Sequence, residues 1–201
     1  MKIFFVRHGK DDDQHRGGWS DHDLTQEGRM QAAQLAKHLR NHKEDYNITK
    51  IISSDLKRAL TTAECISEKL GIPVQQEPQL REMNNGDLAG MLNAQANTQY
   101  PGLYFNTLKM DEAYPNGESP NTFYLRIQKW FTGFCSQRDS NGNVLIVTHG
   151  GVINIIYHLV SNIEWSNRTP PFRTSHCGIY ILDMDEMKFE VDDSIISLKR
   201  Q

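Results

Sequence analysis

Two histidines in this sequence each follow directly on a short apolar run. Residues 2–6 lead into Arg7-His8, and residues 143–148 lead into His149. A short apolar run that stops at a polar, glycine-containing stretch is typical of a buried strand. If the two strands lie parallel in one sheet, both histidines leave it at the same edge, where open α/β sheets bind their ligands. A neutral imidazole there could attack phosphorus through its nitrogen lone pair.

Two arginines stand where they could hold the anion that such a nucleophile attacks. Arg7 adjoins His8, and Arg58 falls in the first turn of a predicted helix, soon after the apolar strand at residues 50–54. A planar guanidinium gives a phosphoryl group two parallel charge-assisted hydrogen bonds. A cation near a helix N-terminus opposes the helix dipole, and a bound anion would offset that cost. Gly150 precedes the last predicted core helix and leaves backbone N–H groups open to a ligand oxygen, so we expect it to bind substrate.

Glu82 is the best candidate for a general acid. A departing alkoxide needs a proton, and a carboxyl group beside a bound anion can supply one. Taken alone, Glu82 is one of many carboxylates and could equally be a solvated turn residue. For His8 alone, a structural histidine bonded to neighbouring backbone is the simpler interpretation. The second strand that ends in a histidine, His149, favours a site.

The helices predicted by apolar periodicity would position these residues. Thr25 is the expected N-cap of a helix whose apolar face covers residues 32–39. Asp55 is the expected N-cap of the next helix, and Gly71 and Pro73 should end it.

The middle of the chain, residues 74–118, shows little apolar periodicity. Within it, residues 80–86 are typical of a strand end that passes into a turn. Residues 91–110 are typical of short helices. Ser119 is the expected N-cap of a helix whose aromatic stripe we assign to the core. Residues 177–191 are expected to form a hairpin that completes the sheet.

Strands that alternate with helices predict an α/β fold with three layers. We expect a mostly parallel central sheet with helices on both of its faces. The length of 201 residues is that of one domain, and no repeat or linker divides it, so we expect a single domain over residues 1–201.

The composition excludes several classes of function. A net charge of −3 and a pI near 6.2 give no overall footprint for nucleic acid or acidic lipid. No apolar run is long enough for a membrane span or a signal peptide. Three scattered cysteines do not indicate a disulfide framework, so we expect reduced thiols in a cytoplasmic protein. No His/Cys/Asp cluster has metal-ligand spacing, so we expect neither metal nor cofactor. No exposed apolar stripe indicates an oligomeric state.

Several motifs, in this order along the chain, resemble the histidine phosphatase (phosphoglycerate mutase-like) superfamily. They are Arg7-His8-Gly9; Gly18-Trp19-Ser20-Asp21 with Leu24-Thr25 and Gly28; Ser53-Ser54-Asp55-Leu56-Lys57-Arg58-Ala59; Leu80-Arg81-Glu82 with Gly86; Pro115-Asn116-Gly117-Glu118-Ser119; and Val147-Thr148-His149-Gly150-Gly151. The resemblance implies a phosphoglycerate mutase-like fold and a phosphohistidine intermediate on His8. It implies that Arg7, Arg58 and His149 hold the phosphate, and that Glu82 donates and then accepts the proton. No metal is implied, because the two arginines would neutralise the charge.

The chain departs from the family pattern after its first motif. After this motif the family usually has Glu or Gln, then Thr or Ser, and an Asn several residues later. This sequence instead has Lys10 followed by three aspartates. Gln14 stands near the Asn position, so we expect it to bind substrate. We expect the aspartates at residues 11–13 to form a solvated, charged turn. Residues 91–116 lack the basic clusters with which the true mutases hold phosphoglycerate, which favours a phosphatase.

We therefore expect a phosphoric monoester hydrolase of the histidine acid phosphatase type, acting on a small-molecule phosphate ester. A 2,3-bisphosphoglycerate-dependent phosphoglycerate mutase is the first alternative, because it would use the same phosphohistidine. A non-catalytic module that binds a phosphorylated ligand is the second, although the complete set of site residues argues against it. The sequence does not identify the ester, and we assign its selection to residues 10–23 and 91–116.

Overall fold

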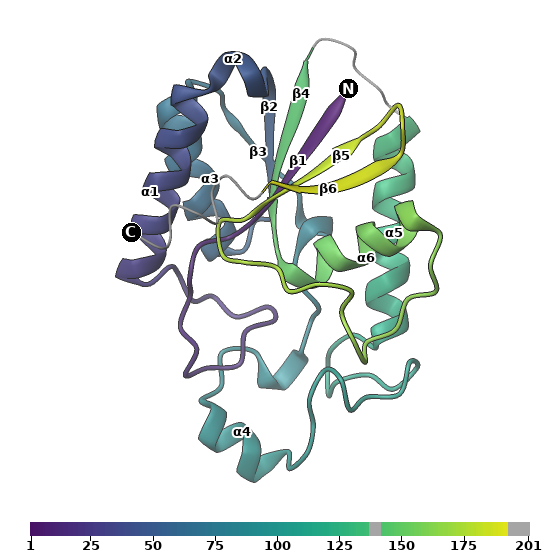
Figure 1. Cartoon of the computed structure of the whole chain (residues 1–201). Coiled ribbons are helices and arrows are strands. Elements are labelled where there is room, and N and C mark those ends of the chain that lie inside the picture. Colours follow the sequence, from purple (N-terminus) through teal and green to yellow (C-terminus); the bar gives the residue numbers. More distant parts are fainter. Residues whose placement is uncertain (137–141, 193–201) are drawn as a thin grey trace.

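The computed structural model describes residues 1–136 and 142–192, and a six-stranded sheet runs through its centre. The strand order is β3-β2-β4-β1-β5-β6 (Figure 1). The strands are β1 Lys2–Arg7, β2 Ile48–Ser53, β3 Val74–Gln76, β4 Asn143–Thr148, β5 Ile179–Asp183 and β6 Lys188–Asp192.

Four neighbouring strands of this sheet are parallel, and β5 runs against them. β4 pairs in parallel with both β1 and β2, and β2 pairs in parallel with β3. β5 is antiparallel to β1 and to β6, so the hairpin predicted at the end of the chain is confirmed. The register sets Arg7 opposite Thr148 and Ser53 opposite Val147. The residues that follow these three strands therefore emerge together at one edge.

Helices cover both faces of the sheet, which confirms the three-layer α/β architecture. The helices are α1 Gln26–Asn41, α2 Lys43–Tyr46, α3 Lys57–Leu70, α4 Asn93–Gln99, α5 Pro120–Ser136 and α6 Gly150–Ser161. Figure 1 shows α1 and α3 on one side of the sheet and α5 and α6 on the other. No helix in the described ranges is long and apolar enough to cross a membrane.

The apolar run of β1 contributes to two cores because its side chains alternate between the two faces. Phe4 and Val6 pack in the core under α1 and α3, while Ile3 and Phe5 pack in the core under α5 and α6. All four are buried. A strand buried on both faces reads as a continuous apolar run, which is why the sequence shows no alternation here.

The predicted helix ends are confirmed at Thr25 and Gly71. The Thr25 hydroxyl accepts a hydrogen bond from the N–H of Gly28 at 3.1 Å, and Gly71 ends α3 with a φ of 73°. The prediction for Asp55 is wrong, because Leu56 is the N-cap of α3. The Asp55 carboxylate instead accepts two hydrogen bonds from the guanidinium of Arg81, at 2.5 and 2.6 Å. A bidentate ion pair outweighs one capping bond.

The irregular middle of the chain was predicted least well. The expected strand end at residues 80–86 is wrong: 3₁₀ turns lie at Pro78–Leu80 (η1) and Gly86–Leu88 (η2), and the short edge strand β3 precedes them. The expected short helix is confirmed as α4. Figure 1 shows α4 and the loop at residues 10–23 gathered beyond the carboxyl ends of β1 and β4.

Candidate active site

His8 follows β1 directly, and its imidazole is buried beside the end of β4. Its Nδ1 lies 2.7 Å from the carbonyl oxygen of Gly9, which can only accept, so Nδ1 carries the proton. The other nitrogen, Nε2, therefore holds the lone pair. Burial and the neighbouring guanidinium groups of Arg58 and Arg7 hold the pKa of His8 well below its usual value. His8 is thus a neutral imidazole whose Nε2 lone pair is a potential nucleophile.

His149 follows β4 and faces His8 with the ring centroids 5.0 Å apart. It is fully buried at the N-cap of α6, and its Nε2 lies 2.9 Å from the hydroxyl oxygen of Ser54. Burial, then the charge of Arg58, keeps the pKa of His149 well below its usual value. Its Nδ1 is buried and has no hydrogen-bond partner among the described residues.

Arg58 extends from the first turn of α3 into the interior and is only 2% exposed. Its guanidinium donates to the backbone oxygen of Gly18 at 2.7 Å and to that of Ser20 at 3.3 Å. Its Nε donates a long hydrogen bond, 3.4 Å, to Nε2 of His8. A phosphoryl oxygen that approaches the His8 lone pair would be within reach of this guanidinium.

Arg7 reaches the same edge from the end of β1. Its Nη1 donates to the carbonyl oxygen of Thr174 at 2.8 Å, whereas its Nε is buried without a hydrogen-bond partner in the described ranges. That Nε is near Gly150, 3.8 Å from where a Cβ on Gly150 would stand. Such a Cβ would also lie 2.7 Å from the hydroxyl of Thr174, so a side chain here would displace Thr174.

Glu82 lies just beyond η1, in the segment that passes under the N-terminus of α6. Its carboxylate accepts hydrogen bonds from the backbone N–H groups of Met83 and Gly151, each at 3.1 Å. A Cβ at Gly151 would collide with this carboxylate, so glycine permits the approach. The carbonyl oxygen of Glu82 accepts from the indole of Trp19 at 2.7 Å. The carboxylate is thus fixed at one position.

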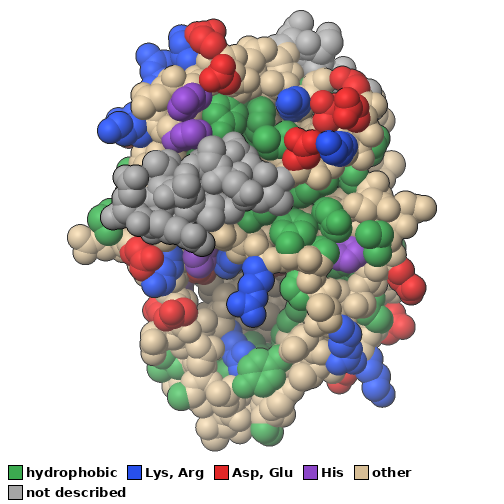
Figure 2. Space-filling view, viewed as in Figure 1, with side chains coloured by type: hydrophobic (Ala, Val, Ile, Leu, Met, Phe, Trp, Pro, Cys, Tyr) green, Lys and Arg blue, Asp and Glu red, His purple; other side chains and the backbone are tan. Residues whose placement is uncertain are grey.

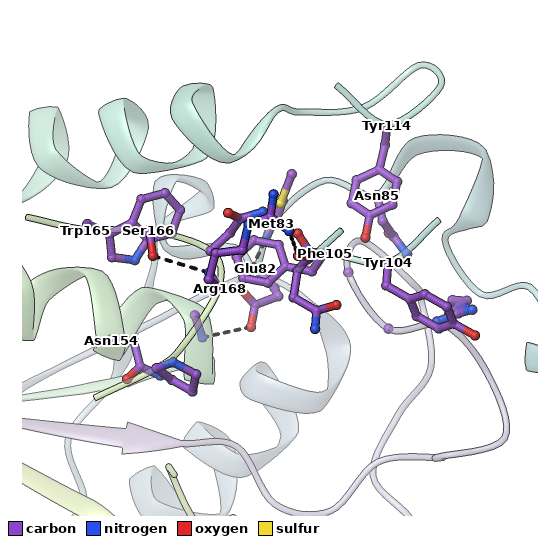
Figure 3. A pocket seen from close by; sticks show the side chains of 17 residues that line it. Glu82, Met83, Asn85, Tyr104, Phe105, Tyr114, Asn154, Trp165, Ser166 and Arg168 are labelled. Carbon is purple, nitrogen blue, oxygen red and sulfur yellow. Dashed lines mark hydrogen bonds between the residues drawn. The ribbon is translucent and has the colours of Figure 1, made fainter. Parts of the chain in front are cut away.

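A pocket of about 540 Å³ opens next to the histidines, and Glu82 lies on its wall (Figure 3). Gly18 and Gly151, which contact Arg58 and Glu82, line it as well. Its far walls carry aromatic side chains from segments that are distant in the sequence: Tyr104, Phe105, Tyr114 and Trp165. Figure 2 shows a hollow in this part of the surface, with basic and hydrophobic side chains at its edge. Glu82 therefore borders a space large enough for a leaving group and contacts Gly151, two residues after His149.

The aspartates at residues 11–13 have different surroundings. The expectation that they form a solvated turn is wrong for Asp11. Its side chain is 20% exposed, and one carboxylate oxygen lies 3.4 Å from Nε of Arg58. The attraction between the Asp11 carboxylate and the buried guanidinium of Arg58 outweighs the solvation of the carboxylate by water. Asp12 accepts from the Nδ1 of His15 at 2.8 Å, and Asp13 is exposed.

Gln14 is the one predicted site residue that the structure does not bring to this edge. It is exposed and does not line the pocket. Its backbone N–H donates to Asp12 at 2.8 Å, and its carbonyl oxygen accepts from the N–H of Asn93 at 2.9 Å. These bonds tie the loop to α4, and substrate binding by Gln14 stays a prediction.

Among the residues that the structure describes, two groups of side chains could hold a metal ion, contrary to the expectation from sequence spacing. They are His8 with Asp11 and His176, and Asp12 with His15 and His22; within each group the potential ligand atoms lie within 4.8 Å of one another. Linear spacing misses them because loops and strand ends bring the ligands together. In the first group the positive charges of Arg58 and Arg7 oppose a cation, and Asp11 already faces Arg58.

Ser54 and Thr174 belong to the site although no role was predicted for them. Ser54 follows β2, and its hydroxyl oxygen contacts His149 and accepts from the N–H of Leu56 at 3.3 Å. A polar residue at the carboxyl end of a buried strand was the signal that could have singled it out. Thr174 comes from a segment without periodicity, and no sequence signal points to it.

Fold and site together define an α/β protein of phosphoglycerate mutase-like architecture, with buried histidine and arginine side chains gathered at one edge of the sheet. The model of the histidine phosphatase superfamily (branch 1) matches residues 3–195, so the chain belongs to this superfamily.

Similar proteins carry the names of both phosphatases and mutases. The probable phosphoglycerate mutase GpmB of Erwinia tasmaniensis is 30% identical over 190 residues, covering 91% of this chain and 85% of that protein. The putative phosphoserine phosphatase 2 of Hydrogenobacter thermophilus is 30% identical over 171 residues, covering 83% and 81%. Among solved structures, Bacillus stearothermophilus YhfR has a TM-score of 0.80 at 26% identity, covering 94% of each chain. Mycobacterial glucosyl-3-phosphoglycerate phosphatase has a TM-score of 0.75 at 25% identity, covering 95% and 96%.

Proposed function

We propose that this protein is a phosphomonoesterase that hydrolyses a small-molecule phosphate ester through a phosphohistidine on His8. One observation carries the proposal: Nδ1 of His149 and Nε of Arg7 are buried without hydrogen-bond partners in the described ranges, at the sheet edge where Nε2 of His8 holds its lone pair. Unpaired buried polar atoms are costly unless a ligand satisfies them. A phosphoryl group would satisfy both, if His149 carries its proton on Nδ1.

In the first step Nε2 of His8 attacks phosphorus, and the bond between phosphorus and the ester oxygen breaks. Arg7, Arg58 and His149 hold the phosphoryl oxygens and balance their charge. Glu82, on the wall between the phosphate site and the pocket, gives its proton to the departing oxygen. The products are phosphohistidine and an alcohol that leaves through the pocket.

In the second step water attacks the same phosphorus, and the bond to Nε2 of His8 breaks. Glu82, now a carboxylate, accepts the proton from the attacking water. Inorganic phosphate leaves, and His8 regains its lone pair. Its Nδ1–H keeps the bond to Gly9 throughout, so the imidazole does not change tautomer.

The mutase alternative uses the same first step but returns the phosphoryl group to a retained acceptor. Relatives named probable phosphoglycerate mutase keep this alternative open. Residues 91–116 contain one basic residue, Lys109, so this insert offers no basic cluster for a phosphoglycerate. The pocket has aromatic walls in addition to two arginines, which supports an ester larger than a phosphoglycerate.

A metabolite panel tests the proposal. Inorganic phosphate should be released from several esters, including p-nitrophenyl phosphate, in the absence of 2,3-bisphosphoglycerate. Exchange between 2- and 3-phosphoglycerate that depends on 2,3-bisphosphoglycerate, with little phosphate release, would establish the mutase. Binding of phosphate esters without any turnover would establish a non-catalytic module.

A further inference from the structure

Two arginines that line the pocket have no acidic partner within residues 1–136 and 142–192. Arg16 and Arg168 both face the space beyond Glu82. Four other arginines are paired with carboxylates: Arg29 with Asp23, Arg58 with Asp11, Arg81 with Asp55 and Arg126 with Glu118. Neither Arg16 nor Arg168 has such an ion pair in the part of the chain that the structure describes. An uncompensated guanidinium at a pocket wall attracts an anion.

Arg16 is held in place by neutral groups only. Its Nη2 donates to the amide oxygen of Asn97 at 2.7 Å, and its guanidinium lies 4.3 Å from the ring centroid of Tyr104. These contacts fix the position of the side chain without neutralising it. Its Nε is buried and has no hydrogen-bond partner among the described residues. The guanidinium therefore offers a free donor together with a full positive charge.

Arg168 reaches the pocket from the segment that follows α6, remote in sequence from Arg16. Its Nη1 donates to the backbone oxygen of Asn106 at 2.5 Å, and its backbone N–H donates to the hydroxyl of Ser166. Figure 3 shows it among the aromatic and amide side chains of the pocket. Its partners are again neutral.

The lining contains one acid, Glu82, which the proposed mechanism uses. Two guanidinium groups against one carboxylate leave the pocket with net positive charge. Asn154 sets a second requirement for the ligand. Its Nδ2 donates to the backbone oxygen of Gly150 at 2.8 Å, while its Oδ1 is buried without a partner in the described ranges. That oxygen needs a hydroxyl or N–H donor.

The volume of about 540 Å³ exceeds what a group of three or four atoms would fill. Pockets of about 300–1,000 Å³ take ligands of drug or nucleoside size. The aromatic walls favour a ring or another broad apolar surface between the two charged ends.

From these contacts we infer that the preferred ester carries a second anionic group, bound by Arg16 and Arg168, on a ring-sized body with a hydrogen-bond donor for Asn154. The second anion is a carboxylate or a phosphate, since a guanidinium fork fits both. This inference rests on the proposed function, because the pocket is taken to hold the leaving group.

Matched aryl phosphates test it. 4′-Carboxybiphenyl-4-yl phosphate and its 4′-carboxamide differ in one charge at the far end; a 4′-phosphate and the shorter 4-carboxyphenyl and 4-carbamoylphenyl esters extend the series. We expect kcat/KM to favour the charged member of a pair by about tenfold or more, the value of one charge-assisted hydrogen bond. Comparison of the carboxylate with the phosphate identifies the second anion.

The ratio within each pair is then measured in Arg16→Met and in Arg168→Met. It should fall toward one in both, and because it is taken within one protein, a general loss of activity cancels. Arg40→Met, which removes an exposed guanidinium at the end of α1, should keep the ratio of the unmodified protein. A ratio near one in the unmodified protein, or one retained in both pocket variants, would overturn the inference.

Failure of the proposed function can be distinguished from failure of this inference. If no ester is hydrolysed, dissociation constants for the same pairs, measured by calorimetry, report the preference without turnover. A charge preference in binding that Arg16→Met abolishes, with no hydrolysis, would reject the phosphatase and keep the anion site. Equal dissociation constants within every pair would overturn the inference.

Discussion

The Nε of Arg58 lies 3.4 Å from Nε2 of His8, the nitrogen that the bond to Gly9 leaves with a lone pair. In the proposed mechanism this guanidinium holds the phosphoryl group at the atom that attacks it. Burial, and then the charge of Arg58, lower the pKa of His8, so the imidazole stays neutral and keeps a lone pair on Nε2. The proposal thus assigns one side chain two roles, keeping the nucleophile neutral and binding its target.

Glu82→Gln should slow phosphorylation of His8 most for esters with poor leaving groups. A general acid contributes about 10²–10⁴ in rate, and an alkyl oxygen needs its proton more than p-nitrophenolate does. Glutamine has one acceptor oxygen for the two backbone N–H groups that Glu82 binds, so some general loss is expected. The informative quantity is therefore the rate ratio between an alkyl phosphate and p-nitrophenyl phosphate, measured before the steady state. An unchanged ratio would assign Glu82 a positioning role.

Ser54→Ala should weaken catalysis by altering the tautomer of His149. The hydroxyl oxygen of Ser54 accepts from Leu56, so its own proton can go to Nε2 of His149, which leaves Nδ1 as the protonated donor toward phosphate. We expect kcat/KM to fall about tenfold and the ¹⁵N spectrum of His149 to show a shifted tautomer. Ser53→Ala removes a neighbouring buried hydroxyl that bonds only the backbone oxygen of Ser54, and is the control. Equal losses in both variants, with an unchanged spectrum, would contradict this role.

The buried histidines should make the protein less stable in mild acid. The pKa of His8 and that of His149 are lowered in the fold, so below about pH 6.5 the unfolded chain binds protons that the native state does not. Their contribution to stability is present above that pH and lost as the pH falls toward the native values. The slope is about 1.4 kcal/mol per pH unit for each histidine. Urea unfolding from pH 7 to pH 5 measures it.

The matched variants for this slope are His8→Gln and His42→Gln. His8→Gln should remove one histidine's share of the slope. His42→Gln changes an exposed side chain at the end of α1, leaves both buried histidines in place and is the control. Identical slopes in both variants and in the unmodified protein would show that His8 is not the group that titrates. Because the lowered pKa keeps His8 neutral, phosphorylation of His8 should persist below pH 6.5.

Activity should survive removal of metal ions. Arg7 and Arg58 supply the positive charge at the phosphate site, and their repulsion disfavours a cation between His8, Asp11 and His176. Turnover after dialysis against EDTA should stay within about twofold of the untreated protein. Complete loss that one divalent ion restores would show that this metal group takes part in the reaction.

The part of the site that could be predicted lies at strand ends and helix starts. His8, His149 and Arg58 stand where an apolar run stops or a helix begins, and parallel register brings such points together. Glu82 needed the family resemblance, because a carboxylate in an irregular segment carries no local signal. The fold followed from the alternation of apolar runs with periodic segments, and both cores confirm it.

The parts that could not be predicted depend on contacts between distant segments. The environment of Asp11 is set by Arg58, 47 positions away, and the aromatic walls of the pocket join residues 104–114 with Trp165. Asp55 failed as a cap because Arg81, also remote, offered two hydrogen bonds. Linear patterns record periodicity and local bonding, whereas these choices are made by tertiary packing.

The covalent intermediate is the most direct test of the account. The protein is mixed with a phosphate ester, quenched in alkali within milliseconds, digested and sequenced by mass spectrometry, since phosphohistidine is lost in acid. The account predicts one phosphoryl group on His8 that forms at least as fast as turnover, and none in His8→Ala, which should also lack turnover. Turnover by His8→Ala, or phosphate trapped on another residue of the unmodified protein, would contradict it.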